Sequence, residues 1–262
     1  MKPDAPSVAE AERVELSVGS VGVVDEGTGP TFVAVHGLPG SVRDWRWLAP
    51  ALTPHARLVR IDLPGFGNTP HGGFGYDIDA RGAFVAGVIE GLGLEDAVVL
   101  GHSMGGAVAA SAARQSDRVR AVGLIASIGP TMHVMLRRMP GVRLGCYSLH
   151  APPVASALMP VLRRSFERTG FRNVPDAEIL QACFVIARLR FATHRRNLRE
   201  LAKPTLVAWA ADDALVEEAI SEKLYWSAPV GPRIRFPTGG HNIQATRATE
   251  LAEALVAWER TL

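Results

Sequence analysis

The stretch Val98-Val99-Leu100-Gly101-His102-Ser103-Met104-Gly105-Gly106 decides how this chain folds, because an apolar run meets a Gly-x-Ser-x-Gly motif there. The Ala-rich segment that follows is typical of a helix, so the motif marks a sharp turn from a buried strand into a helix. Small residues let the two elements approach each other at such a turn. The motif predicts a Ser103 hydroxyl held above the sheet, where it can attack a carbonyl, with an incidental serine in a Gly-rich turn as the alternative.

Strands and helices alternate on both sides of this turn. A hairpin is expected first, with strands at Val14–Val18 and Val21–Val24 joined by Gly19 and Ser20. Apolar runs predict further strands at 31–36, 57–62, 97–100, 119–126, 205–210 and 233–236, and helical patterns occupy 44–52, 77–92, 104–115, 217–226 and 248–260. This order predicts an α/β protein with a mostly parallel, doubly wound sheet and a ligand site at the carboxyl ends of its strands.

The alternation stops between residues 127 and 202, where the sequence becomes helical and rich in arginine. Helices are expected at 132–139, 154–168 and 176–201. A helical insertion before the last two strands predicts a cap, or lid, over the site. We therefore expect a core formed by residues 1–126 and 203–262 and a cap formed by residues 127–202.

Composition limits the classes of function. The chain has 262 residues, 47% of them hydrophobic, and a net charge of only +2, which gives no argument for nucleic-acid binding. Residues 1–14 lack the apolar segment of a signal peptide, and no apolar run is long enough to span a membrane, so a cytoplasmic location is expected. Cys146 and Cys183 lack metal-ligand spacing, which predicts two buried free thiols, no metal and no cofactor.

A serine nucleophile needs a base, and the base needs an acidic partner. Of the eight histidines, only His241 follows the last predicted strand, in a Gly-rich loop that can carry its imidazole over the sheet edge. No acidic residue lies between Asp117 and Glu167, so the acid cannot follow the strand at 119–126. The strand at 205–210 is instead followed by Asp212 and Asp213, either of which can orient the histidine.

A second Gly-rich loop follows the strand at 31–36. Glycines at a strand end allow backbone N–H groups to approach a ligand closely. Pro39 has no N–H, so the free donor of this loop is Leu38.

Five motifs in order resemble the α/β-hydrolase superfamily over essentially the whole chain. They are His36-Gly37-Leu38-Pro39-Gly40, Asp62-Leu63-Pro64-Gly65-Phe66-Gly67, Gly101 to Gly106, Ala210-Ala211-Asp212-Asp213 and Gly240-His241. The resemblance implies an α/β-hydrolase fold, and its spacing places the acid at Asp213. It also implies that the N–H groups of Leu38 and Met104 form an oxyanion hole.

The nucleophile restricts the chemistry that this resemblance implies. Epoxide hydrolases and haloalkane dehalogenases need an aspartate nucleophile, so Ser103 excludes both. The expected function is hydrolysis of small-molecule carboxylic esters through an acyl-enzyme, with Ser103, His241 and Asp213 as the catalytic residues. Lactonases and thioesterases share this chemistry. A ligand-binding member without catalysis is a less favoured alternative.

Hydrolases that cleave carbon–carbon bonds of ring-cleavage dienoates are a further alternative. In those enzymes an arginine of the lid binds the acidic substrate, and the helical insertion of this chain is rich in arginine. If residues 176–201 form one helix, Arg190 and His194 lie on its apolar face and are expected to bind substrate. His102 and Asn242 flank the expected catalytic residues and are further candidates for substrate contacts. The dienoate enzymes often have Asn before the serine and Trp after the histidine, where this chain has His102 and Asn242. Ester hydrolysis therefore ranks first.

Overall fold

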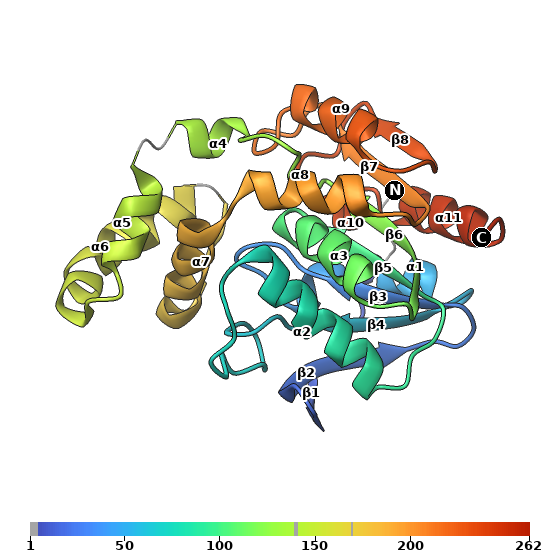
Figure 1. Ribbon diagram of the computed structural model, residues 1–262, viewed down its shortest axis with the longest axis horizontal. Coiled ribbons are helices and arrows are strands. Elements are labelled where there is room, and N and C mark those ends of the chain that lie inside the picture. The colour runs from blue at the N-terminus through green and yellow to red at the C-terminus, as the bar shows by residue number, and fades with distance from the viewer. Residues whose placement is uncertain (1–4, 139–140, 169) are drawn as a thin grey trace.

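The computed structural model describes residues 5–138, 141–168 and 170–262. Its centre is a sheet of eight strands in the described part of the chain, in the order β1-β2-β4-β3-β5-β6-β7-β8 (Figure 1). The strands are β1 (Glu12–Leu16), β2 (Gly19–Glu26), β3 (Thr31–Val35), β4 (Arg57–Ile61), β5 (Ala97–His102), β6 (Val119–Ile125), β7 (Thr205–Ala210) and β8 (Arg233–Phe236). Strands β1 and β2 run antiparallel to their neighbours, and all other pairs are parallel. The predicted fold class is confirmed.

The amino-terminal hairpin differs from its prediction in the position of the turn. Leu16 pairs with Gly19, so the turn consists of Ser17 and Val18. The Val18 side chain packs against α2 (Ile78–Gly91) at Gly87, where a Cβ would lie 2.4 Å from it. This contact fixes Val18 at the turn, and the second strand begins earlier than its apolar residues indicate.

Two apolar layers cover the sheet. Successive side chains of a strand point to opposite faces, and in β3 Val33 and Val35 enter one layer while Phe32 and Ala34 enter the other. Figure 1 shows α2 and α3 (Met104–Gln115) side by side against the sheet, with the helices that follow β6 above and to the left of them. The core helices are α1 (Ala49–Leu52), α2 (Ile78–Gly91), α3 (Met104–Gln115), α9 (Glu218–Ser227), α10 (Ile243–Thr246) and α11 (Ala248–Glu259).

The helix expected at 44–52 is divided. A 3₁₀ helix spans Val42–Trp45, and α1 begins only at Ala49. Pro50 lies in the first turn of α1, where a residue without an N–H is tolerated. The prediction of one continuous helix was therefore wrong.

In the described residues between β6 and β7 there are five helices: α4 (Val134–Arg137), α5 (Val142–Ser148), α6 (Pro152–Arg168), α7 (Asp176–Arg188) and α8 (Phe191–Glu200). Helix α5 was not predicted, and the expected helix at 132–139 is shorter, with Met139 outside the described residues. Cys146 and Cys183 are buried and free, as predicted. No helix in the described ranges is both long and apolar enough to cross a membrane.

The helix expected at 176–201 consists of two helices that meet at an angle in Figure 1. Leu189 and Arg190 adopt extended conformations between α7 and α8, and the Leu189 side chain is buried against Leu136 and Ile220. Helix α8 packs on α2, α3 and α9 of the core, whereas α5 and α6 pack on α7. The division of the chain into core and cap at residue 202 stays a prediction.

Candidate active site

Ser103 lies at the apex of the turn between β5 and α3, with φ 54° and ψ −123°. This positive φ is strained for a residue with a side chain, and such strain persists where surrounding structure enforces it. The flanking glycines allow the turn: a Cβ on Gly101 would lie 2.3 Å from the Gly105 carbonyl oxygen, and one on Gly105 would lie 2.4 Å from that of His36. The two glycines therefore allow β5, α3 and the end of β3 to meet.

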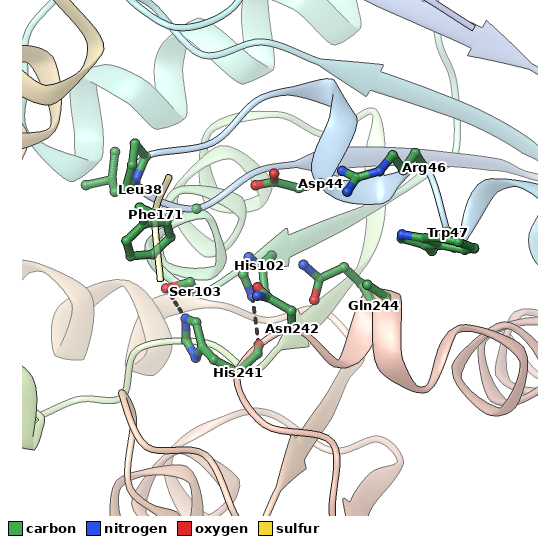
Figure 2. Close-up of a pocket in the computed structure, with 13 residues that line it drawn as sticks. Leu38, Asp44, Arg46, Trp47, His102, Ser103, Phe171, His241, Asn242 and Gln244 are labelled. Atoms are coloured by element: carbon green, nitrogen blue, oxygen red, sulfur yellow. Dashed lines mark hydrogen bonds between the residues drawn. The ribbon is translucent and has the colours of Figure 1, made fainter. Parts of the chain in front are cut away.

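Three side chains from distant parts of the sequence form one hydrogen-bonded chain. His241 Nε2 lies 2.9 Å from Ser103 Oγ, and His241 Nδ1 lies 2.7 Å from Asp213 Oδ2. Because Asp213 accepts from the Nδ1–H, the free lone pair of His241 faces the serine hydroxyl, which donates to it. Figure 2 shows the imidazole below Ser103. The structure thus brings together the three residues expected to be catalytic.

The Asp213 carboxylate is held by several donors. Its second oxygen accepts hydrogen bonds from the N–H groups of Leu215 and Val216, at 2.8 and 3.0 Å. Burial alone raises the pKa of a carboxyl group, but the hydrogen bonds from His241 and these two amides outweigh it, and the pKa of Asp213 falls below its usual range. Asp213 is consequently a fixed anion beside the imidazole.

The two residues expected to supply backbone donors lie beside the nucleophile. Leu38 follows the end of β3, and Met104 is the first residue of α3, whose N–H has no partner within the helix. Both residues line one pocket with Ser103. In the described ranges the Leu38 N–H donates to no other protein group. These N–H groups are therefore available to a substrate oxygen.

His36 and Asp62 hold the loop that carries Leu38. Buried His36 donates from Nδ1 to the Gly37 carbonyl, 2.8 Å away, and accepts at Nε2 from the Leu63 N–H, 2.9 Å away. Burial lowers its pKa to about 4, so it stays neutral. The Asp62 carboxylate accepts from the N–H groups of Val42 and Asn68. These bonds tie the loops after β3 and β4 together.

His102 and Asn242 line the pocket beside Ser103. His102 donates from Nε2 to the carbonyl of His241, 2.9 Å away, and burial lowers its pKa to about 3. It therefore supports the loop that carries His241. Asn242 is exposed at the rim of the pocket.

The arrangement expected for Arg190 and His194 was wrong. Because the chain bends between α7 and α8, Arg190 is an exposed residue at the start of α8 rather than part of an apolar stripe. His194 is fully buried and donates from Nε2 to the Ile128 carbonyl at 3.2 Å, and burial lowers its pKa to about 4. Neither residue lines the two pockets at Ser103.

Two pockets meet at Ser103 and share Leu38, Phe171 and His241. One has a volume of about 180 Å³ and polar walls that include Asp44 and Gln244 (Figure 2). The other has a volume of about 60 Å³ and is mostly apolar, with additional walls formed by Met104, Ile128, His133, Met135, Leu136, Ile186, Leu189, Leu215 and Val216. Asp44, Phe171 and Gln244 were not predicted to line the site, because no sequence motif distinguishes them from other loop and helix residues.

Comparison with known proteins agrees with this geometry. Residues 30–248 match the family model described as alpha/beta hydrolase fold. The chain belongs to the α/β-hydrolase family. This α/β hydrolase is 29% identical to haloalkane dehalogenase 2 of Mycobacterium tuberculosis over 94% of each chain. It is 28% identical to 2-hydroxy-6-oxo-2,4-heptadienoate hydrolase of Pseudomonas putida over 82% of this chain and 84% of that protein. A thermophilic esterase from Thermogutta terrifontis shares its fold, with a TM-score of 0.74, 23% identity and coverage of 97% and 99%.

Proposed function

We propose that this α/β hydrolase cleaves small-molecule carboxylic esters through an acyl-enzyme intermediate. The observation that carries the proposal is the hydrogen-bonded chain from Asp213 through His241 to Ser103, which ends at a strained strand-to-helix turn. This is the arrangement that a serine hydroxyl needs to act as a nucleophile.

In the proposed mechanism, His241 Nε2 takes the proton of Ser103 as Oγ attacks the ester carbonyl carbon. The N–H groups of Leu38 and Met104 donate to the oxygen that becomes negatively charged, a contribution typically worth roughly 2.7–4 kcal/mol for one donor. Asp213 stabilises the imidazolium, and His241 then gives its proton to the leaving alcohol. Water attacks the acyl-enzyme by the same route and releases the acid.

Haloalkane dehalogenation does not follow from the relative of that name, because Ser103 replaces the aspartate that this chemistry needs. Cleavage of a dienoate is the second candidate, and it is suggested by the similarity to the dienoate hydrolase of Pseudomonas putida. The exposed position of Arg190, away from both pockets, weighs against it.

The test compares the wild type with Ser103→Ala on p-nitrophenyl butyrate, ethyl butyrate and one ring-cleavage dienoate. We expect ester turnover in the wild type, a loss of at least about 10³-fold in the variant, and labelling of Ser103 by a fluorophosphonate probe. Turnover of the dienoate alone favours the second candidate. Binding of esters without turnover or labelling contradicts the proposed function.

A further inference from the structure

Gln244 lies in an unusual position for an amide side chain. It belongs to the short helix α10, three residues after His241, and only 1% of the residue is exposed. It nevertheless lines the polar pocket at Ser103. Figure 2 shows the amide at its tip turned toward the space beside His102.

The amide of Gln244 is not satisfied by the protein. Its Oε1 is buried and has no hydrogen-bond partner among the described residues. Leaving a buried acceptor unpaired is unfavourable, and an apolar side chain of the same shape avoids that penalty. Because Gln244 also lines the pocket, a polar group that enters there would remove this penalty.

The pocket also offers two further polar groups. The Nδ1 atom of His102 is buried without a partner, and it is an acceptor because Nε2 carries the proton that is donated to His241. Asp44 lies on the opposite wall, and burial raises the pKa of its carboxyl to about 7. Near neutral pH this carboxyl can both donate and accept a hydrogen bond.

The charges at the pocket select the kind of group. Arg46 lies at the exposed rim and disfavours a cation, whereas Asp44 disfavours an anion. A hydroxyl group is uncharged and both donates and accepts, which matches an amide and a partly protonated carboxyl. The volume of about 180 Å³ leaves room for a short hydroxylated chain attached to the reacting carbonyl.

We propose that Gln244 and Asp44 form a subsite for a hydroxyl group of the ester substrate, beside Ser103 and opposite the apolar pocket. The proposal rests on the proposed ester hydrolysis and names its substrate class: esters with a hydroxylated group on one side of the carbonyl and a small apolar group on the other. The hydroxyl can belong to the alcohol or to the acyl group.

The test uses Gln244→Met, which keeps the length of the side chain and removes its hydrogen bonds. Ethyl butyrate is compared with 2-hydroxyethyl butyrate, which has a hydroxyl on the alcohol, and with ethyl 3-hydroxybutyrate, which has it on the acyl group. For one of the hydroxylated esters we expect the ratio of its kcat/KM to that of ethyl butyrate to fall roughly tenfold. The affected ester identifies the side that occupies the subsite. Equal changes for all three esters, or none, overturn the subsite.

Gln181→Met is the matched control, because Gln181 in α7 also has a buried, unpaired Oε1 but does not line either pocket at Ser103. Its ratio of activities on the three esters should equal that of the wild type; a change as large as that of Gln244→Met overturns the assignment. Saturation-transfer NMR on Ser103→Ala, with and without Gln244→Met, measures binding of the esters without turnover. If Gln244→Met weakens binding of the hydroxylated ester alone, the subsite is supported, even if the wild type hydrolyses no ester. The absence of hydrolysis would contradict only the proposed function. Binding that is unchanged by Gln244→Met indicates a structural water only and overturns the subsite.

Discussion

The carboxylate of Asp212 accepts a hydrogen bond from the N–H of Gly240, at 2.7 Å, and so fixes the residue directly before His241. Its neighbour Asp213 contacts the imidazole itself. Two adjacent aspartates thus hold the same loop at successive positions, one at the backbone and one at the ring. Only the second lies in line with Ser103.

This division predicts different outcomes for two similar substitutions. Asp213→Asn should lower kcat by about 10⁴-fold, because an amide cannot stabilise the imidazolium and can favour the wrong tautomer of His241. Asp212→Asn should stay within a few fold of the wild type, since the amide oxygen can still accept from Gly240. Steady-state kinetics on p-nitrophenyl butyrate measures both. The reverse order would move the acidic role to Asp212.

The close approach at Gly105 predicts a large loss of stability in Gly105→Ala. The new Cβ would lie 2.4 Å from the His36 carbonyl oxygen, so backbone must shift. Overpacking of this kind typically costs about 1–3 kcal/mol, and for a chain of this size we expect the melting temperature to fall by at least about 2 °C.

Gly145→Ala is the control for that substitution. Gly145 lies in α5, and a Cβ there meets nothing within 4 Å. Because alanine is a better helix former, this variant should gain up to about 1 kcal/mol in the free energy of unfolding. Equal melting temperatures for the two variants would contradict the packing argument.

Asp44 predicts an unusual dependence of stability on pH. Burial raises its pKa from 3.8 to about 7, so between these values the folded protein binds a proton that the unfolded chain has lost. This group therefore makes stability fall as the pH rises from about 4 to 7, and its unfavourable effect is complete above pH 7. Asp44→Asn should leave the melting temperature nearly unchanged at pH 4 and raise it by about 3 °C or more at pH 8.

Asp79→Asn is a control of opposite sign. Burial opposes ionisation of Asp79, but hydrogen bonds from Asn197, Ser111 and Arg196 outweigh it and lower the pKa. Its stabilising effect is present at neutral pH and is lost as the pH falls through the lowered pKa. This variant should be less stable than the wild type at pH 8. Differential scanning calorimetry across pH 4–8 measures both variants, and a flat difference for Asp44→Asn would refute the prediction.

The small apolar pocket predicts a preference for short chains that one cap residue controls. Met135 contributes to its wall, so Met135→Ala should enlarge it and move the optimum toward longer acyl or alkyl chains. Each additional buried methylene is worth about 0.8 kcal/mol, or roughly fourfold in kcat/KM. A series from acetate to octanoate esters measures the optimum. Met159→Ala, a cap substitution away from this pocket, should leave it unchanged.

The arrangement of side chains at the sheet edge could be predicted from the sequence because it depends on local patterns. Ser103 lies between glycines that only a tight turn requires, and His241 follows the last strand. The strands adjoining the site are buried, and β3 and β5 are continuous apolar runs. The choice between Asp212 and Asp213 depended on a family spacing, since both residues occupy the same loop.

The cap could not be predicted to the same depth. Its helices are amphipathic, so periodicity indicates them, but the bend at Leu189 depends on burial against α4 and α9, which are far away in sequence. For the same reason Arg190 was expected on an apolar face that does not exist. Phe171 and Gln244 enter the site through tertiary packing, and no local signal reports that.

The two pockets at Ser103 have different origins in the chain. Apart from Phe171, the polar pocket consists of residues at or after the ends of β3, β5 and β8 and in the short segments that follow, whereas the apolar pocket takes Met135, Leu136, Ile186 and Leu189 from the segment between β6 and β7. For the ester substrate proposed above, exchange of this inserted segment between relatives is therefore expected to alter the preferred hydrocarbon chain more than the recognition of the hydroxyl. The two halves of such a substrate could then change independently.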